Sequence, residues 1–178
     1  LTAERAELRQ ARAAVLPGVG AFGDAMKSLR ARGLEEPIRA FIASGKPFLG
    51  ICLGLQLLFE SSEESPGVAG LGLLKGKILR LPAESGLKIP HIGWNSLTIR
   101  KPGGLFAGVE GEPYVYFVHS YYLQAEEDVV AATAEYGATI HAAVQKDNLL
   151  ACQFHPEKSG EVGLKLLRNF KAMAEGGN

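Results

Sequence analysis

The spacing of apolar positions changes about halfway along the chain. In the first half, apolar residues recur at helical spacing in segments 22–29 and 34–42, which predicts two amphipathic helices. From Gly70 onward, short alternating runs are separated by glycine and proline, a pattern typical of antiparallel strands. The expected strands are residues 76–81, 96–100, 114–118, 129–136, 140–145 and 149–154. A last helix is expected over residues 162–173, where it would cover the sheet.

A strand and a glycine-rich turn are expected ahead of the first helix. Residues 13–16 form a short apolar run that stops at the turn PGVG, residues 17–20. Ligands bind outside the carboxyl ends of strands in open α/β sheets, so this turn is a candidate binding segment. The polar segment 145–148, QKDN, predicts a hairpin connection. Together these patterns predict a single α/β domain, βα-type in its first half and β-rich in its second, around one mixed sheet.

The stretch 46–56, KPFLGICLGLQ, carries the most specific local pattern in the chain. Its apolar residues up to Ile51 suit a strand buried on both faces, and those from Leu53 onward recur at helical spacing. Cys52, with a glycine two residues away on either side, therefore lies where a strand turns into a helix. That is the geometry of a nucleophile elbow with cysteine in place of serine. The helix start favours a thiolate, so we expect a lowered pKa; a buried structural cysteine is the alternative.

Composition narrows the classes of function. The chain has 178 residues, of which 47% are hydrophobic and 21% charged, ordinary values for one globular domain with a sizeable core. Its 19 basic and 19 acidic residues cancel, and without a Lys/Arg cluster we expect no nucleic-acid or membrane surface. The longest apolar run, residues 47–59, is too short to span a membrane, and no signal segment is recognisable. Two cysteines, Cys52 and Cys152, make no disulfide framework, so a cytoplasmic protein is expected.

His155 and Glu157 form a second candidate for chemistry. Pro156 favours an extended conformation for His155, and alternate residues of an extended segment point the same way, so imidazole and carboxylate should project together. A carboxylate beside an imidazole sets its tautomer, the orienting role in a catalytic triad. His155 and Cys52 are both expected at carboxyl ends of strands, where they can meet, and His119 is expected near the same rim. A surface turn with a charge pair is the alternative for this segment.

Four separated motifs, taken together and in order, resemble one family. They are GICLGLQ (50–56), PHIGWN (90–95), YFVHSYY (116–122) and QFHPEKSG (153–160). The chain resembles the class I, or triad, glutamine amidotransferases over roughly residues 17–170. Within them it is similar to the glutaminase subunits of imidazole glycerol phosphate synthase, more than to anthranilate-synthase, GMP-synthetase or pyridoxal-phosphate-synthase relatives. The resemblance implies a flavodoxin-like open mixed sheet flanked by helices, and no cofactor or metal.

The resemblance also implies roles for individual residues. Cys52 would attack the side-chain amide of glutamine, giving a thioester and ammonia, with His155 moving the proton and Glu157 orienting His155. The N–H groups of Leu53 and Val19 would meet the oxyanion. Glycines beside Val19 would let that segment rotate, so that a partner could switch the oxyanion hole on. The residues matching those that hold the α-amino and α-carboxylate groups of the substrate are Gln56, Glu64, Ser120 and Tyr121.

A partner follows from the same resemblance, because ammonia released into water becomes ammonium and is lost as a nucleophile. The family docks on a TIM-barrel cyclase subunit that uses the nitrogen for histidine biosynthesis. The expected docking residues are Trp94, Asn95, Tyr116 and Lys158. A solvated helix face for Gln56, a loop charge for Glu64, and a core aromatic or solvated lysine at the docking face remain alternatives. So do other functions: a subunit of another class I amidotransferase, a catalytically silent regulatory homologue, or a separate cysteine hydrolase of γ-glutamyl compounds.

The start of the chain departs from the family pattern. Family members carry a strand and a helix with a glycine-rich turn before the region that corresponds to residues 13–20, whereas this chain begins at Leu1. We expect residues 1–178 to be a single glutamine amidotransferase domain that lacks its first βα unit and belongs to a longer chain. In a flavodoxin-like strand order the first strand is interior, so its loss would leave a gap in the sheet.

Overall fold

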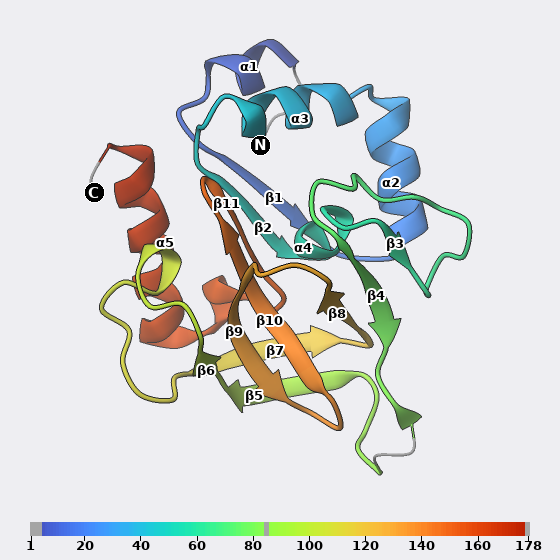
Figure 1. The fold of residues 1–178 in the computed structure, drawn as a ribbon, viewed down its shortest axis with the longest axis vertical. Helices are drawn as coiled ribbons and strands as arrows, with labels where there is room; N and C mark the ends of the chain where they lie inside the picture. Colours follow the sequence, from blue (N-terminus) through green and yellow to red (C-terminus); the bar gives the residue numbers. More distant parts are fainter. Residues whose placement is uncertain (1–4, 84–85, 177–178) are drawn as a thin grey trace.

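The computed structural model describes residues 5–83 and 86–176, and Figure 1 shows their arrangement. The helices are α1 (Arg5–Gln10), α2 (Phe22–Ala31), α3 (Glu35–Ala43), α4 (Leu53–Leu57) and α5 (Gly160–Ala174). The strands are β1 (Ala14–Gly18), β2 (Phe48–Cys52), β3 (Ser61–Ser62), β4 (Gly76–Arg80), β5 (His91–Ser96), β6 (Thr98–Ile99), β7 (Tyr114–His119), β8 (Tyr121–Ala125), β9 (Val130–Glu135), β10 (Thr139–Lys146) and β11 (Leu149–Cys152). Short 3-10 helices span Gly104–Phe106 and Pro156–Lys158.

The main sheet is mixed and carries six strands in the order β1-β2-β11-β10-β9-β6. β1, β2 and β11 run parallel to their neighbours in this group, while β10, β9 and β6 continue the sheet in antiparallel pairs. The expected α/β fold, an open mixed sheet flanked by helices, is therefore confirmed. Two smaller sheets, β3-β4-β8 and β5-β7, are separate from it. The expectation that the strands form one mixed sheet is therefore wrong, because the described strands form three sheets.

The expected gap in the main sheet is also wrong. β1 pairs directly with β2, with Ala14 opposite Phe48 and Gly18 opposite Cys52. Within the described residues β1 is an edge strand of this sheet. Edge strands accept proline, which explains why β1 continues through Pro17 although the sequence suggested a strand that stops there.

Two hydrophobic cores lie on the two faces of the main sheet. Successive residues of β11 show the division: Leu149 and Ala151 belong to the core shared with α2 and α3, whereas Leu150 and Cys152 belong to the core shared with α5. In Figure 1, α5 accordingly lies on the other side of the sheet from α2 and α3. Burying one large apolar side chain contributes about 1.5–3 kcal/mol, so both faces hold β2 and β11 in place. Burial in the α5 core accounts for Cys152.

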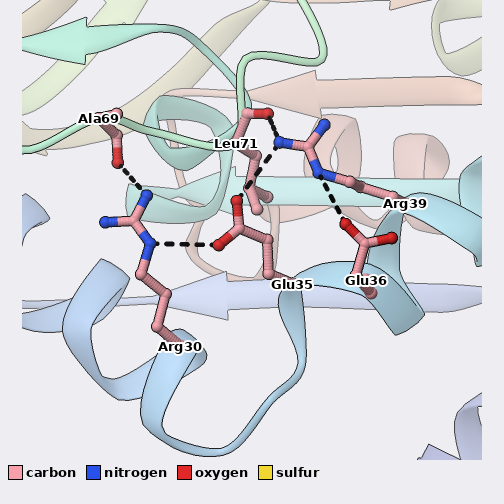
Figure 2. A network of polar contacts seen from close by, with 6 residues as sticks. All are labelled: Arg30, Glu35, Glu36, Arg39, Ala69 and Leu71. Atoms are coloured by element: carbon pink, nitrogen blue, oxygen red, sulfur yellow. Dashed lines mark hydrogen bonds and ion pairs between the residues drawn. The ribbon is translucent and has the colours of Figure 1, made fainter.

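Two arginines fasten α2 and α3 to the loop between β3 and β4 (Figure 2). Arg30 donates to the carbonyl oxygen of Ala69 at 2.8 Å and pairs with Glu35 at 3.1 Å. Arg39 contacts the same carboxylate at 3.3 Å and donates to the carbonyl oxygen of Leu71. Exposed ion pairs alone contribute little, but the two bonds to backbone carbonyls position the loop. This loop also carries part of the candidate site.

Among the described residues, no helix is long and apolar enough to cross a bilayer.

Candidate active site

Cys52 lies at a sharp turn between β2 and α4, as the sequence predicted. Its backbone has φ +54° and ψ −112°, a conformation that is costly for a residue with a side chain. The turn brings chain segments too close for larger residues. A Cβ on Gly54 would lie 1.8 Å from the carbonyl oxygen of Leu16, and one on Gly50 would lie 2.9 Å from that of Gly54. The elbow therefore depends on both glycines. The helix after it is shorter than the apolar spacing suggested, because it ends at Leu57.

The expectation that Cys52 has a lowered pKa is wrong. Burial raises the pKa of Cys52 above its ordinary value, and the nearby charge of Glu157 acts in the same direction. The N–H of Leu53 and the side-chain amide of Gln153 oppose this effect but do not outweigh burial. A buried environment penalises the charged form of a group, and here that penalty exceeds the attraction of the helix start. The sulfur therefore needs a base to deprotonate it.

His155 is placed as such a base. It follows β11 in an extended conformation, φ −99° and ψ 98°, immediately before Pro156, as predicted. Its Nδ1 lies 2.8 Å from Oε1 of Glu157. The Ser159 hydroxyl donates to its carbonyl oxygen at 2.6 Å, and its own N–H donates to the Tyr116 carbonyl at 2.9 Å. In the neutral imidazole a proton on Nδ1 leaves Nε2 free to accept one. Nε2 is buried without a hydrogen-bond partner within the described chain.

Cys52 and His155 line the same cavity, which has a volume of about 320 Å³. The cavity opens where β2, β7 and β11 end, so it lies at the expected rim of the sheet. The lining residues are Val19, Gly20, Cys52, Leu53, Gln56, Glu64, Pro90, Val118, His119, Ser120, Tyr121 and His155. Glu157 instead lines a second cavity of about 350 Å³, which His155 and Val19 also border. The structure thus brings Cys52 and His155 to one cavity, with the Glu157 carboxylate on the far side of the imidazole.

The four residues expected to hold the substrate all line the first cavity. Gln56 is 5% exposed, so it does not lie on a solvated helix face. Both hydrogens of its amide nitrogen are engaged, by the Tyr121 carbonyl at 3.1 Å and by Oε1 of Gln153 at 3.0 Å. Any contact of Gln56 with a substrate ammonium must therefore use Oε1. Glu64 accepts the N–H of Phe22 at 2.8 Å, so its carboxylate is held at the first turn of α2.

The two backbone donors expected for an oxyanion also border this cavity. Leu53 is the first residue of α4 and is buried, and its N–H is directed at the Cys52 sulfur. Val19 also lines the cavity, and the residue is 84% exposed. The adjacent Gly20 has φ +95°, which is a conformation that glycine adopts without strain. The PGVG segment therefore borders the cavity, with the Val19 residue largely exposed.

Three of the four expected docking residues gather on one face of the β5-β7 ribbon. Trp94 lies opposite Tyr116 in the strand pairing, with ring centroids 6.1 Å apart, and Nζ of Lys158 lies 6.0 Å from the Tyr116 ring. Trp94 is 55% exposed, which excludes a core aromatic. Asn95 points to the other face, since neighbouring strand residues alternate. Its side chain donates to the carbonyl oxygen of Glu135 at 3.0 Å.

Sequence reasoning missed Gln153 and only partly recognised His119. Gln153 is fully buried, and its Nε2 lies 3.7 Å from the Cys52 sulfur. A glutamine inside the otherwise apolar run LLACQF, two residues before His155, was the available signal. His119 lines the cavity, as expected, but the sequence did not reveal its hydrogen bond to His91 at 3.0 Å. In the described part of the chain, no group of three or more His, Cys, Asp or Glu side chains is arranged to hold a metal ion.

Comparison with known proteins places this fold and site in a family. The model of the class I glutamine amidotransferase family matches residues 2–173. A crystal structure of a glutamine amidotransferase has a TM-score of 0.74 at 21% identity, covering 98% of this chain and 85% of the other. PurLQS from Thermotoga maritima has a TM-score of 0.68 at 22% identity, with coverage of 90% and 78%. The chain belongs to the class I glutamine amidotransferase family.

Curated relatives narrow the assignment within that family. A protein from Caldanaerobacter subterraneus is 52% identical over 97% of this chain and 85% of its own length. Proteins from Methanothermobacter thermautotrophicus and Trichormus variabilis are each 54% identical, over 96% of this chain and 83% and 82% of their own lengths. Each is named imidazole glycerol phosphate synthase subunit HisH. The chain belongs with these HisH subunits.

Proposed function

We propose that this chain is the glutaminase subunit of an imidazole glycerol phosphate synthase. It hydrolyses glutamine to glutamate and ammonia and passes the ammonia to a cyclase subunit for histidine biosynthesis. The observation that carries this proposal is the placement of Cys52 and His155 on one cavity, with Glu157 bonded to the far side of the imidazole. The membership of the HisH group supports the choice of reaction.

The first half of the reaction forms a thioester. Nε2 of His155 takes the Cys52 proton as the sulfur attacks the amide carbon of glutamine, which suits a thiol whose pKa is raised. Glu157 stabilises the imidazolium that forms. The N–H groups of Leu53 and Val19 hold the negative oxygen of the tetrahedral intermediate. The imidazolium then donates its proton to the amide nitrogen, the carbon–nitrogen bond breaks, and ammonia leaves.

The second half regenerates the enzyme. His155 takes a proton from water, the resulting hydroxide attacks the thioester carbon, and the carbon–sulfur bond breaks to release glutamate. The Cys52 thiolate recovers its proton from His155. Throughout, the carboxylate of Glu64 and Oε1 of Gln56 face the α-ammonium group of the substrate. Ser120 and Tyr121, from the turn between β7 and β8, face its α-carboxylate.

The released ammonia requires a partner. A neutral amine that reaches water is protonated and loses its nucleophilicity, so a docked cyclase with a TIM-barrel fold receives it directly, in the cytoplasm. The docking face is formed by Trp94, Tyr116 and Lys158, which lie together beside the His155 segment. Asn95, on the other face of the ribbon, supports the strand through its bond to Glu135. Rotation of the PGVG segment by the partner would complete the oxyanion hole.

The test is to replace Cys52 and to measure both glutamine hydrolysis and binding to the cyclase. Cys52→Ala should lower glutamine hydrolysis, assayed with the cyclase partner present, by at least about 1,000-fold, since the covalent step is lost. Binding to the cyclase should stay within about twofold of the unmodified protein. Substantial residual hydrolysis would contradict the proposal. Hydrolysis of γ-glutamyl peptides in preference to glutamine, without the partner, would favour a separate hydrolase instead.

A further inference from the structure

The carbonyl oxygen of Tyr121 determines the direction of a chain of buried hydrogen bonds. It receives Nε2 of Gln56 at 3.1 Å and Nδ1 of His119 at 2.9 Å. A carbonyl oxygen can only accept, so both nitrogens must carry a hydrogen that points at it. This requirement settles which end of the Gln56 amide is nitrogen and which tautomer His119 adopts, two assignments that otherwise depend on surroundings.

The orientation of Gln56 then determines the orientation of Gln153. The second hydrogen of the Gln56 amide points at Gln153, 3.0 Å away, so the atom that receives it must be Oε1 of Gln153. Nε2 of Gln153 is consequently the atom that faces the Cys52 sulfur, at 3.7 Å. Reversing the Gln56 amide would set two acceptors against each other, and reversing the Gln153 amide would set two donors against each other. Either is costly in a site where Gln56 is 5% and Gln153 0% exposed.

On the other side of the Tyr121 carbonyl, the series of hydrogen bonds continues through His119 to His91. With a hydrogen on Nδ1, Nε2 of neutral His119 accepts, and Nδ1 of His91 must donate to it across 3.0 Å. His91 is 3% and His119 6% exposed. Burial lowers the pKa of each to about 4, so both are neutral near pH 7 and these donor and acceptor roles persist.

We propose that Gln153 is a catalytic N–H donor to the sulfur of Cys52, and that Gln56, His119 and His91 act as positioning residues that prevent its amide from turning over. This inference rests on the proposed function of Cys52. The donor acts each time the sulfur carries negative charge: when His155 removes the proton, and when the thioester collapses. A hydrogen bond to a charged acceptor is about twice as strong as one to a neutral acceptor, so it favours the thiolate over the thiol. An amide is too weak an acid to protonate the sulfur, so no proton is transferred.

The test measures the ionisation of Cys52 apart from its turnover. In Gln153→Met the side chain keeps its length and loses the donor; in Gln153→Glu the acceptor toward Gln56 stays and the donor is lost. The rate of iodoacetamide alkylation of Cys52 is followed against pH, with peptide mass spectrometry to separate it from Cys152. Both variants should raise the midpoint of this profile by at least about half a pH unit. kcat/KM for glutamine, measured with the cyclase, should fall roughly tenfold or more.

A matched control is available on the neighbouring strand. Gln145 on β10 also uses its Oε1 as an acceptor, in this case for the backbone N–H of Leu105 at 3.2 Å, and it does not line the cavity. Gln145→Met should leave the alkylation midpoint and kcat/KM within error of the unmodified protein. A shift equal to that of Gln153→Met would overturn the specific role of Gln153.

Two further variants test the positioning residues. His119→Leu removes the donor to Tyr121 and should raise the alkylation midpoint, while His119→Asn keeps an N–H there and should restore most of the original value. A His119→Leu protein with an unchanged midpoint would overturn the positioning role.

The proposed role of Gln153 as a donor is rejected if Cys52 in either folded Gln153 variant is alkylated with an unchanged midpoint. If neither variant folds, NMR of the ¹⁵N-labelled protein replaces them: the Gln153 side-chain amide should shift as Cys52 ionises, and an unchanged resonance rejects the proposal. Because Cys52→Ala tests the reaction separately, failure here is distinguishable from failure of the proposed function.

Discussion

Two buried histidines show how packing sets the protonation of single residues. His91 stacks between Phe117 and Tyr136, with ring centroids 4.7 Å and 3.8 Å away, and it donates to His119. The rings stacked on His91 are uncharged and do not compensate a positive charge, so burial holds the pKa of both imidazoles near 4. The unfolded chain, with an ordinary histidine pKa near 6.5, takes up protons that the folded chain does not.

This difference predicts a dependence of stability on pH. Between pH 6.5 and about 4 the unfolded state binds more protons, so the free energy of unfolding should fall as the pH is lowered through this window. The slope should approach about 1.4 kcal/mol per pH unit for each histidine. Urea denaturation at several pH values measures it. His119→Asn, which keeps an N–H for the Tyr121 carbonyl and does not titrate, should show a smaller slope; an equal slope would contradict the assignment.

At the scale of residues, the sequence was informative about backbone geometry and less informative about electrostatics. The glycines around Cys52 predicted the elbow, and Pro156 predicted the extended conformation of His155, because both follow from local steric limits. The pKa of Cys52 was predicted in the wrong direction, since the depth of its burial depends on distant segments. Gln153 was overlooked for the same reason: its partners are Cys52 from β2 and Gln56 from α4, far away in the chain.

At the scale of elements, α2 is capped from a distant loop. Phe22 donates its N–H to Glu64 at 2.8 Å, and Gly23 donates its N–H to Ser65 Oγ at 3.0 Å. Ala21 at the N-cap has no side chain that can serve. Acceptors at the first turn satisfy otherwise unpaired N–H groups. The neighbouring residues Glu64 and Ser65 therefore share a structural task, but only Glu64 lines the cavity.

Because both Glu64 and Ser65 cap α2 but only Glu64 lines the cavity, substitutions at the two residues should have different effects. Glu64→Gln keeps an acceptor for Phe22 and loses the charge facing the substrate, so KM for glutamine should rise about tenfold with little change in stability. Ser65→Ala loses a cap, so the free energy of unfolding should fall by about 1 kcal/mol with KM unchanged. Steady-state kinetics and urea denaturation separate the two. Equal effects of both variants on KM would show that the cap, and not the charge, matters.

Element prediction succeeded where local signals were strong. The polar QKDN segment marked the β10–β11 hairpin, where Asp147 has φ +52°, and the apolar spacing found α2, α3 and α5. β5 was missed because Gly93, with φ +130°, breaks its alternation. β8 was missed because it follows β7 after the single residue Ser120, with no glycine or proline to separate them. The pairing of β1 with β2 depends on non-local contacts that no short segment encodes.

At the scale of the whole molecule, the exposed aromatic face of the β5-β7 ribbon adjoins the segment that carries His155. The Tyr116 carbonyl accepts the N–H of His155, and the N–H of Tyr116 donates to Ser159 Oγ at 3.0 Å. Movement of the ribbon on docking would therefore reach His155 through the backbone. An exposed tryptophan at such a face is typical of residues that contribute strongly to binding.

Two neighbouring residues on opposite faces test this interface. Trp94→Ala should raise the Kd for the cyclase partner at least about tenfold, since it removes the largest exposed side chain of the face. Asn95→Ala, whose side chain bonds to Glu135 on the other face, should leave Kd within about twofold. Titration calorimetry with purified cyclase measures both. Comparable losses in the two variants would place the contact elsewhere.

The register of two strands sets the distance between Cys52 and His155. Cys52 closes β2 and His155 follows β11, and these strands are bonded neighbours with Ile51 opposite Cys152. A slip of one residue would displace the imidazole by roughly 3.3 Å and turn the strand over, which would separate base from sulfur. Insertions in residues 100–113, between β6 and β7, need not disturb the chemistry while that ladder is intact, because no residue of this segment lines the cavity. Such parts of the spacer are thus free to diverge, whereas the ladder is not.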